Sequence, residues 1–216
     1  MSNSTIDPHA NQPVLTYGAL LDQAQAAMLM VHGRGAGAED ILYLAEELDS
    51  AGIAYLAPQA AGYTWYPQRF LAPLEANQPW LDSAFKKLDS VIKQIAEAGI
   101  PAEKTILLGF SQGACMVLDY AARNGRHWGC VVGLSGGLIG PEIQPERYPD
   151  SLSGTPVFLG CSDIDPHIPK QRVLETAQTM EQLGAVVDAR LYPGMGHTVN
   201  EDELEAVRNL MQGLHG

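Results

Sequence analysis

Short apolar runs alternate with amphipathic segments along most of this chain, and this alternation constrains its fold more than any other feature. The clearest run, residues 26–31, reads AAMLMV and is typical of a strand buried on both faces, as in a parallel sheet. The predicted strands are residues 26–31, 53–57, 105–108, 129–134, 156–160 and 186–191.

The segments between these runs repeat apolar residues three and four positions apart, which is typical of helices with one buried face. In residues 170–183 the positions predicted to face inward include Val173 and Leu174. The last helix is expected to start at Asn200, which forms a capping-box pattern with Glu203. The predicted helices are residues 39–50, 81–98, 112–123, 170–183 and the segment from Asn200 onward.

Repeated strand–helix units predict an α/β fold with a mostly parallel central sheet and helices on both faces. The 216 residues contain no repeat, low-complexity tract or linker, so we expect one domain over residues 1–216. Within it, residues 1–13 are polar and are expected to form a leader. Residues 59–79 and 135–154 are rich in proline and in aromatic residues or glycine, and are predicted as loops.

The charge balance argues against two classes of partner. The chain has 25 Asp+Glu against 13 Lys+Arg, a net charge of -12, whereas nucleic acids and anionic membrane surfaces attract a basic face. No apolar run approaches the ~20 residues that span a bilayer, and the start of the chain lacks the pattern of a signal peptide. Cys115, Cys130 and Cys161 lie in apolar stretches and are odd in number, so we expect no disulfide framework and a cytoplasmic location.

The strongest local motif is Gly109-Phe110-Ser111-Gln112-Gly113, which matches G-x-S-x-G between a predicted strand and a predicted helix. A serine on such a tight turn adopts a strained conformation and needs neighbours without side chains. The Gln112 amide would lie at the start of the helix, where N–H groups have no partner and attract negative charge. The motif therefore predicts a nucleophilic Ser111; the alternative is an ordinary glycine-rich turn.

A nucleophilic serine needs a base and an orienting acid, which follow it in the order acid, then histidine. His197 lies in a glycine-containing loop between the last strand and the last helix, and is predicted to be the base. His167 is its main rival and is expected at the rim of the site. His127, just before a strand, and His215, near the end of the chain, are weaker candidates.

For the acid, Asp163 and Asp165 both follow the strand at 156–160, and position alone does not choose between them. Four segments together resemble the phospholipase/carboxylesterase family of α/β-hydrolases, which includes acyl-protein thioesterases and small bacterial carboxylesterases. They are VHGRG at 31–35, GFSQG at 109–113, DPHIP at 165–169 and GH at 196–197, and the resemblance runs from about Met28 to Leu214.

This resemblance implies an α/β-hydrolase fold with a minimal cap or none, and it implies that Asp165 is the acid and Asp163 a loop residue. It also implies an oxyanion hole formed by the backbone amides of Arg34 and Gln112, and no metal or organic cofactor. Because the family includes dimers, it leaves open whether the chain is a monomer or a homodimer.

Family members often carry an apolar residue where Arg34 stands. We hypothesise that the Arg34 side chain lies at the pocket mouth and favours a polar or anionic substrate; the alternative is an exposed arginine without a role. The wall of the acyl pocket is predicted to contain aromatic and aliphatic side chains, with core packing as the alternative for each. These substrate-binding candidates are Trp65, Tyr66, Phe70, Leu71 and Ile168.

Together these features predict a serine hydrolase that cleaves short- to medium-chain carboxylic esters through Ser111, His197 and Asp165, with an acyl-enzyme intermediate. An acyl thioesterase and a lysophospholipase would use the same residues and stay open as alternatives. The non-enzymatic alternative is a catalytically silent α/β-hydrolase that binds a small molecule.

Overall fold

The computed structural model describes residues 6–48, 51–148 and 150–214. Its centre is a seven-stranded sheet in the order β1-β3-β2-β4-β5-β6-β7, in which β1 is antiparallel to β3 and the other neighbours are parallel. The strands are β1 (Val14–Gly18), β2 (Ala26–Val31), β3 (Ile53–Pro58), β4 (Thr105–Phe110), β5 (Cys130–Leu134), β6 (Pro156–Ser162) and β7 (Val186–Tyr192).

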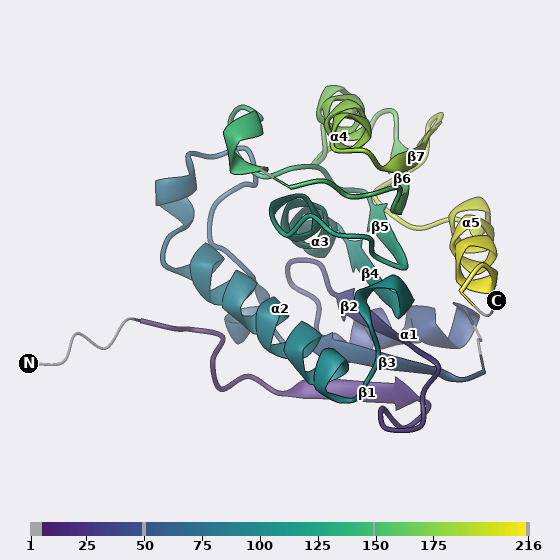
Figure 1. Ribbon diagram of the computed structural model, residues 1–216. Coiled ribbons are helices and arrows are strands. Elements are labelled where there is room, and N and C mark those ends of the chain that lie inside the picture. The colour runs from purple at the N-terminus through teal and green to yellow at the C-terminus, as the bar shows by residue number, and fades with distance from the viewer. Residues whose placement is uncertain (1–5, 49–50, 149, 215–216) are drawn as a thin grey trace, which may run out of the picture.

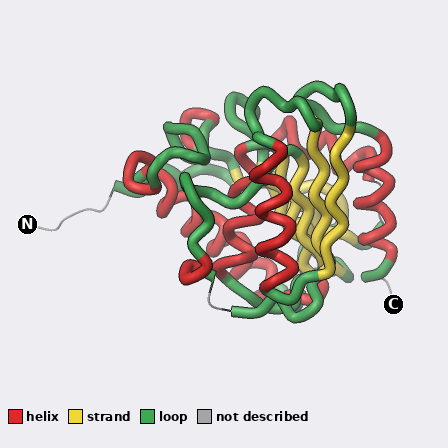
Figure 2. Tube along the Cα trace, turned by 90° about the horizontal axis from the view of Figure 1, so that it is seen from above, coloured by secondary structure: helices red, strands yellow, loops and turns green. Residues whose placement is uncertain are grey.

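Helices cover both faces of this sheet, as Figures 1 and 2 show. The helices α1 (Ala38–Leu48) and α5 (Glu201–Gln212) lie on one face and contact each other. The other face carries α2 (Trp80–Glu97), α3 (Gln112–Arg123) and α4 (Lys170–Gln182). The prediction of an α/β fold with a mostly parallel sheet is confirmed. Among the described residues, no helix is both long and apolar enough to cross a membrane.

The strand β2 shows why the apolar runs predicted this architecture. All six of its residues are buried, and successive side chains point to opposite faces of the sheet. Ala27, Leu29 and Val31 join the core beneath α2 and α3, whereas Met28 and Met30 join the core beneath α1 and α5. A strand covered on both faces has no polar side, so its sequence reads as an unbroken apolar run.

The start of the chain departs from the predicted leader, because the structure places part of it in the domain. His9 is fully buried, and its backbone N–H donates to Ser83 Oγ on α2 at 2.9 Å. Lys87 Nζ, also on α2, donates to the carbonyl of Gln12. The edge strand β1 then follows at Val14 and had not been predicted, since it is short and half-exposed and carries no continuous apolar run.

The helices α4 and α5 differ in how they match the predictions. Leu174 was predicted to face inward, but it is 43% exposed, because it lies about 100° around α4 from the buried Val173. The predicted capping box is present at α5: the Asn200 side chain accepts from Glu203 N–H at 2.9 Å, and Glu203 Oε2 accepts from Asn200 N–H at 2.8 Å.

Candidate active site

Four loops meet at one edge of the sheet, and together they carry the residues singled out from the sequence. The strands β2, β4, β6 and β7 are parallel, so their carboxyl ends lie at the same edge. The loop after β2 carries Arg34, and β4 leads directly into Ser111. The loops after β6 and β7 carry Asp165 and His197. This edge is where open α/β sheets bind their ligands.

Ser111 occupies the sharp turn between β4 and α3. Its φ of 56° and ψ of -117° lie in a region that residues with side chains rarely adopt. A Cβ atom on Gly109 would come within 2.3 Å of the Gly113 backbone, and a Cβ atom on Gly113 within 1.9 Å of the Val31 carbonyl oxygen. Glycine is therefore required at both positions, since any side chain would push α3 away from the sheet.

The side chains of Ser111, His197 and Asp165 form one continuous hydrogen-bonded chain. His197 Nε2 lies 2.8 Å from Ser111 Oγ, and His197 Nδ1 lies 2.7 Å from Asp165 Oδ2. The other carboxylate oxygen accepts from the backbone amides of His167 at 2.8 Å and Ile168 at 3.0 Å. Burial opposes the ionisation of Asp165, but these hydrogen bonds outweigh it and lower its pKa, so the carboxylate is charged at neutral pH.

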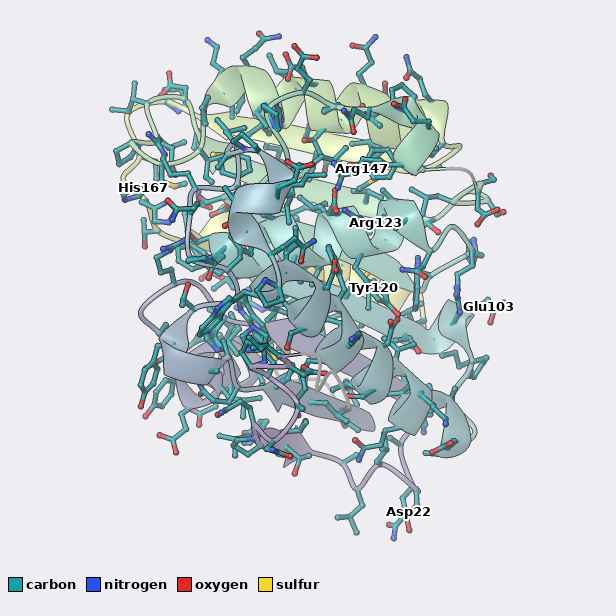
Figure 3. All side chains as sticks on the ribbon, turned by 90° about the vertical axis from the view of Figure 1, so that its left-hand side faces the viewer. Asp22, Glu103, Tyr120, Arg123, Arg147 and His167 are labelled. Atoms are coloured by element: carbon teal, nitrogen blue, oxygen red, sulfur yellow. The ribbon has the colours of Figure 1, made fainter. Side chains whose placement is uncertain are left out.

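The alternative candidates have other partners. Asp163 Oδ1 accepts from the backbone N–H of Gly194 at 2.9 Å, so it ties down the loop that carries His197. His167 is exposed, and its ring lies edge-on to that of His197 with centroids 4.9 Å apart; Figure 3 shows it at the edge of the molecule. His127 Nδ1 contacts the Ser153 carbonyl, and His215 lies outside the described residues.

The side chain of Gln112 links the serine turn to the aromatic loop that follows β3. Gln112 Oε1 accepts from the Trp65 N–H at 2.9 Å, and Gln112 Nε2 donates to the Tyr66 carbonyl at 2.9 Å. As the first residue of α3, Gln112 also has a backbone N–H without an acceptor inside the helix. No sequence pattern predicted this side-chain role, because the two segments lie far apart along the chain.

Arg34 holds the same loop from the other side. Its guanidinium donates to three consecutive backbone carbonyls, those of Tyr66 at 2.9 Å, Pro67 at 2.8 Å and Gln68 at 2.6 Å. Arg34 lines the cavity, but much of its hydrogen-bonding capacity is used within the protein. The two residues expected to form an oxyanion hole therefore both fasten this loop.

Two buried histidines support the loop from below and were not recognised in the sequence. His32 Nε2 accepts from the Ala60 N–H at 3.1 Å, and His9 Nδ1 accepts from the Ala61 N–H at 3.0 Å. Their rings pack against Trp65 with centroid distances of 5.1 and 5.3 Å. Burial lowers the pKa of both histidines, so at neutral pH they are uncharged and can accept these bonds.

A cavity of about 270 Å³ opens beside Ser111. Of the predicted wall residues, Tyr66, Phe70 and Ile168 line it, whereas Trp65 and Leu71 do not. Trp65 is fully buried, and its indole N–H donates to the His32 carbonyl at 2.9 Å, so it belongs to the core beneath the loop. Trp65 thus takes the core position that was the alternative for each wall candidate, and Leu71 packs against the same core. Arg69, Cys115 and His167 also line the cavity.

The three cysteines are free and buried. Cys115 touches the cavity, but burial raises the pKa of its thiol to about 12, so it stays protonated and is a poor nucleophile. Within the described part of the chain, no three His, Cys, Asp or Glu side chains are grouped so that they could hold a metal ion.

A mostly parallel sheet with a serine on the turn from β4 into α3 is the architecture of an α/β-hydrolase. The model of one hydrolase family, described as phospholipase/carboxylesterase, matches residues 19–215. The chain belongs to this family, and it is an enzyme of the esterase or thioesterase type.

Individual relatives agree with this assignment. The acyl-protein thioesterase 1 of Debaryomyces hansenii is 31% identical over an alignment of 225 positions, which covers 94% of this chain and 97% of that protein. A solved phospholipase/carboxylesterase from Dyadobacter fermentans is 40% identical, with a TM-score of 0.92, and covers 97% of this chain and 100% of its own. The carboxylesterase of Bacillus cereus is 20% identical, with a TM-score of 0.73 over 95% of each chain, and shares the fold.

Proposed function

We propose that the protein hydrolyses short- to medium-chain carboxylic esters with Ser111 as nucleophile, His197 as general base and Asp165 as orienting acid. The observation that carries this proposal is the continuous chain from Ser111 Oγ through His197 to Asp165, with contacts of 2.8 and 2.7 Å. Distances in this range allow a proton to pass from the serine to the imidazole as the serine attacks.

In the first half of the reaction, Ser111 Oγ bonds to the ester carbonyl carbon while its proton moves to His197 Nε2. Asp165 stabilises the imidazolium that forms and holds the ring through Nδ1. The backbone amides of Arg34 and Gln112 bind the carbonyl oxygen as it becomes negative; one such donor typically lowers the barrier by about 3 kcal/mol. The carbon–oxygen bond then breaks, and the alcohol leaves with the proton from His197.

In the second half, water takes the place of the alcohol. His197 accepts a proton from the water as its oxygen attacks the acyl-enzyme, and the same two amides bind the second oxyanion. His197 then returns the proton to Ser111, and the carboxylic acid leaves. Neither half requires a metal or an organic cofactor.

The size of the cavity supports a small substrate. The cavity beside Ser111 has a volume of about 270 Å³. That suits a short or medium acyl chain with part of its alcohol, and it is at the small end of ligand pockets. Tyr66, Phe70 and Ile168 provide its apolar surface.

An acyl thioesterase is the second candidate, because the relative from Debaryomyces hansenii carries the name acyl-protein thioesterase 1. A lysophospholipase would also use the same three residues. Oxygen esters and thioesters of equal acyl length, compared by kcat/KM, separate the first two, and lysophospholipid hydrolysis tests the third. A catalytically silent binding protein does not fit a family of hydrolases.

The proposal extends to the cellular context. Free, buried thiols fit a reducing cytoplasmic compartment, and the net charge of -12 disfavours nucleic-acid partners. Static light scattering decides between a monomer and a homodimer.

The first test is hydrolysis of p-nitrophenyl esters over a series of acyl lengths by the wild type and by Ser111→Ala. We expect the variant to lose roughly 10⁴-fold or more in turnover, with Ser90→Ala on α2 as a control that keeps wild-type activity. Activity retained by Ser111→Ala would refute the assignment of the nucleophile. A wild type inactive on every acyl length would refute the proposed substrate class.

A further inference from the structure

The mouth of the cavity is positively charged in a protein that is strongly acidic. The chain carries 25 Asp+Glu against 13 Lys+Arg. Yet the residues that line the cavity include two arginines, Arg34 and Arg69, and none of the lining residues is Asp or Glu. The side chain of Asp165, which lies behind His197, is fully buried. A cleft lined by one sign of charge focuses its field on the entering molecule.

Arg34 is not available as the main binding group. Its guanidinium is held by the carbonyls of Tyr66, Pro67 and Gln68, with Nη···O distances of 2.6–2.9 Å. It keeps its charge and contributes to the local potential, but its geometry is set by the loop. Arg34 therefore positions the cavity wall.

Arg69 differs from Arg34 in the way its side chain and its backbone are held. The side chain is exposed, borders the cavity and makes no hydrogen bond or ion pair with any residue that the structure describes. Its backbone is fixed, because the carbonyl accepts from Ala72 N–H at 3.0 Å and from Asn77 Nδ2 at 3.2 Å. Asn77 is buried, and its Oδ1 accepts at 2.8 Å from the backbone N–H of Gln68, the residue before Arg69. Arg69 thus presents a planar set of donors with no internal partner from a fixed point on the rim.

We propose, on the basis of the hydrolase function proposed above, that the substrate is an ester carrying a carboxylate, and that Arg69 binds this carboxylate at the mouth of the cavity. A guanidinium binds a carboxylate through two parallel hydrogen bonds. The apolar side chains of Phe70 and Ile168 contact the methylene groups between the carboxylate and the scissile bond. Hydrolysis of such an ester consumes one water and yields an alcohol and a dicarboxylic acid when the carboxylate is on the acyl side.

The test compares two esters of equal length and shape. One is the monoethyl ester of a six-carbon dicarboxylic acid, and the other has a carboxamide in place of its free carboxylate. We expect the wild type to favour the carboxylate ester by about tenfold or more in kcat/KM, and we expect added salt to reduce this preference. Arg69→Gln is expected to remove the preference by lowering kcat/KM for the carboxylate ester about tenfold more than for the carboxamide ester, whereas Arg69→Lys keeps part of the preference.

The matched control is Lys93→Gln, which removes one positive charge from a remote site. Lys93 lies on α2, its side chain is 77% exposed, and its Nζ lies 3.7 Å from Glu97 Oε1. This variant should keep the wild-type preference, so a change in net charge alone cannot explain the result for Arg69→Gln.

Three outcomes overturn the inference. A wild type that does not discriminate between the two esters, or an Arg69→Gln variant that keeps the preference, shows that Arg69 is an exposed arginine without a binding role. In either case the proposed hydrolase function stands if Ser111→Ala abolishes hydrolysis of the carboxamide ester. If the wild type hydrolyses neither these esters nor the p-nitrophenyl series, the proposed function fails and the inference fails with it.

Discussion

Replacing Gln112 by methionine is expected to weaken the attachment of the aromatic loop and to lower the stability of the whole domain. Methionine has a similar length, so the main loss is of hydrogen bonds. The Tyr66 carbonyl keeps its bond from Arg34 at 2.9 Å, but the buried Trp65 N–H loses the only acceptor it has among the described residues. A buried amide left without a partner costs about 1–3 kcal/mol.

We therefore expect the unfolding free energy to fall by about 2 kcal/mol. For a domain of this size, that corresponds to a decrease in Tm of about 4–8 °C, measured by differential scanning calorimetry. Gln94→Met on the exposed side of α2 is the control, because surface substitutions away from such contacts usually stay within about 0.5 kcal/mol. A Tm for Gln112→Met within about 1 °C of wild type would refute the role given to this side chain.

Three further predictions concern the acid, a buried carboxyl group and the serine turn. Asp165→Asn should reduce kcat by roughly 10³–10⁴-fold, whereas Asp163→Asn should reduce it by about tenfold at most; equal losses would contradict the assignment. Burial raises the pKa of Glu203 to about 7 in the folded protein. Above pH 7 the buried carboxylate is charged and destabilises the fold, and as the pH falls below 7 it takes up a proton in the folded state and this cost is reduced. Glu203→Gln should therefore exceed the wild type in unfolding free energy by about 3 kcal/mol at pH 8, and by less at pH 5.5; an advantage independent of pH in denaturant titrations would exclude this cause. Gly113→Ala should lower both Tm and esterase activity, because its Cβ would meet the Val31 carbonyl oxygen at 1.9 Å; an unchanged Tm would show that α3 can shift freely.

Much of the fold could be predicted because the five central strands, β2 to β6, are buried on both faces. Apolar runs such as residues 26–31 left few alternatives to a parallel sheet, and the predicted helix at 112–123 has the bounds of α3. The parts that sequence missed lack such a signal. The strand β1 is short and half-exposed, and His9 is buried by contacts with residues more than 50 positions away.

The candidate site shows the same division. The tight turn at Ser111 follows from local glycines, and the expected position of His197 follows from the order of residues along the chain. The choice between Asp163 and Asp165 could not be made from position along the chain, because both follow the same strand. Only the resemblance to a family separated them. Their carboxylates differ in what the neighbouring loop brings to them: Asp165 meets the His197 ring, and Asp163 meets the Gly194 amide.

By itself, the sequence determined the alternation of strands and helices and the backbone conformation of the serine turn, because both depend on residues close together in the chain. The tertiary structure alone decided what the long side chains do. Trp65 is buried in the core, and the Gln112 side chain links the serine turn to the aromatic loop after β3. Arg34 donates hydrogen bonds to the aromatic loop, whereas the donors of Arg69 face the cavity and are available to solvent or substrate. Each of these roles depends on which backbone carbonyls and amides lie within reach, and those groups come from loops that are joined only when the sheet has formed.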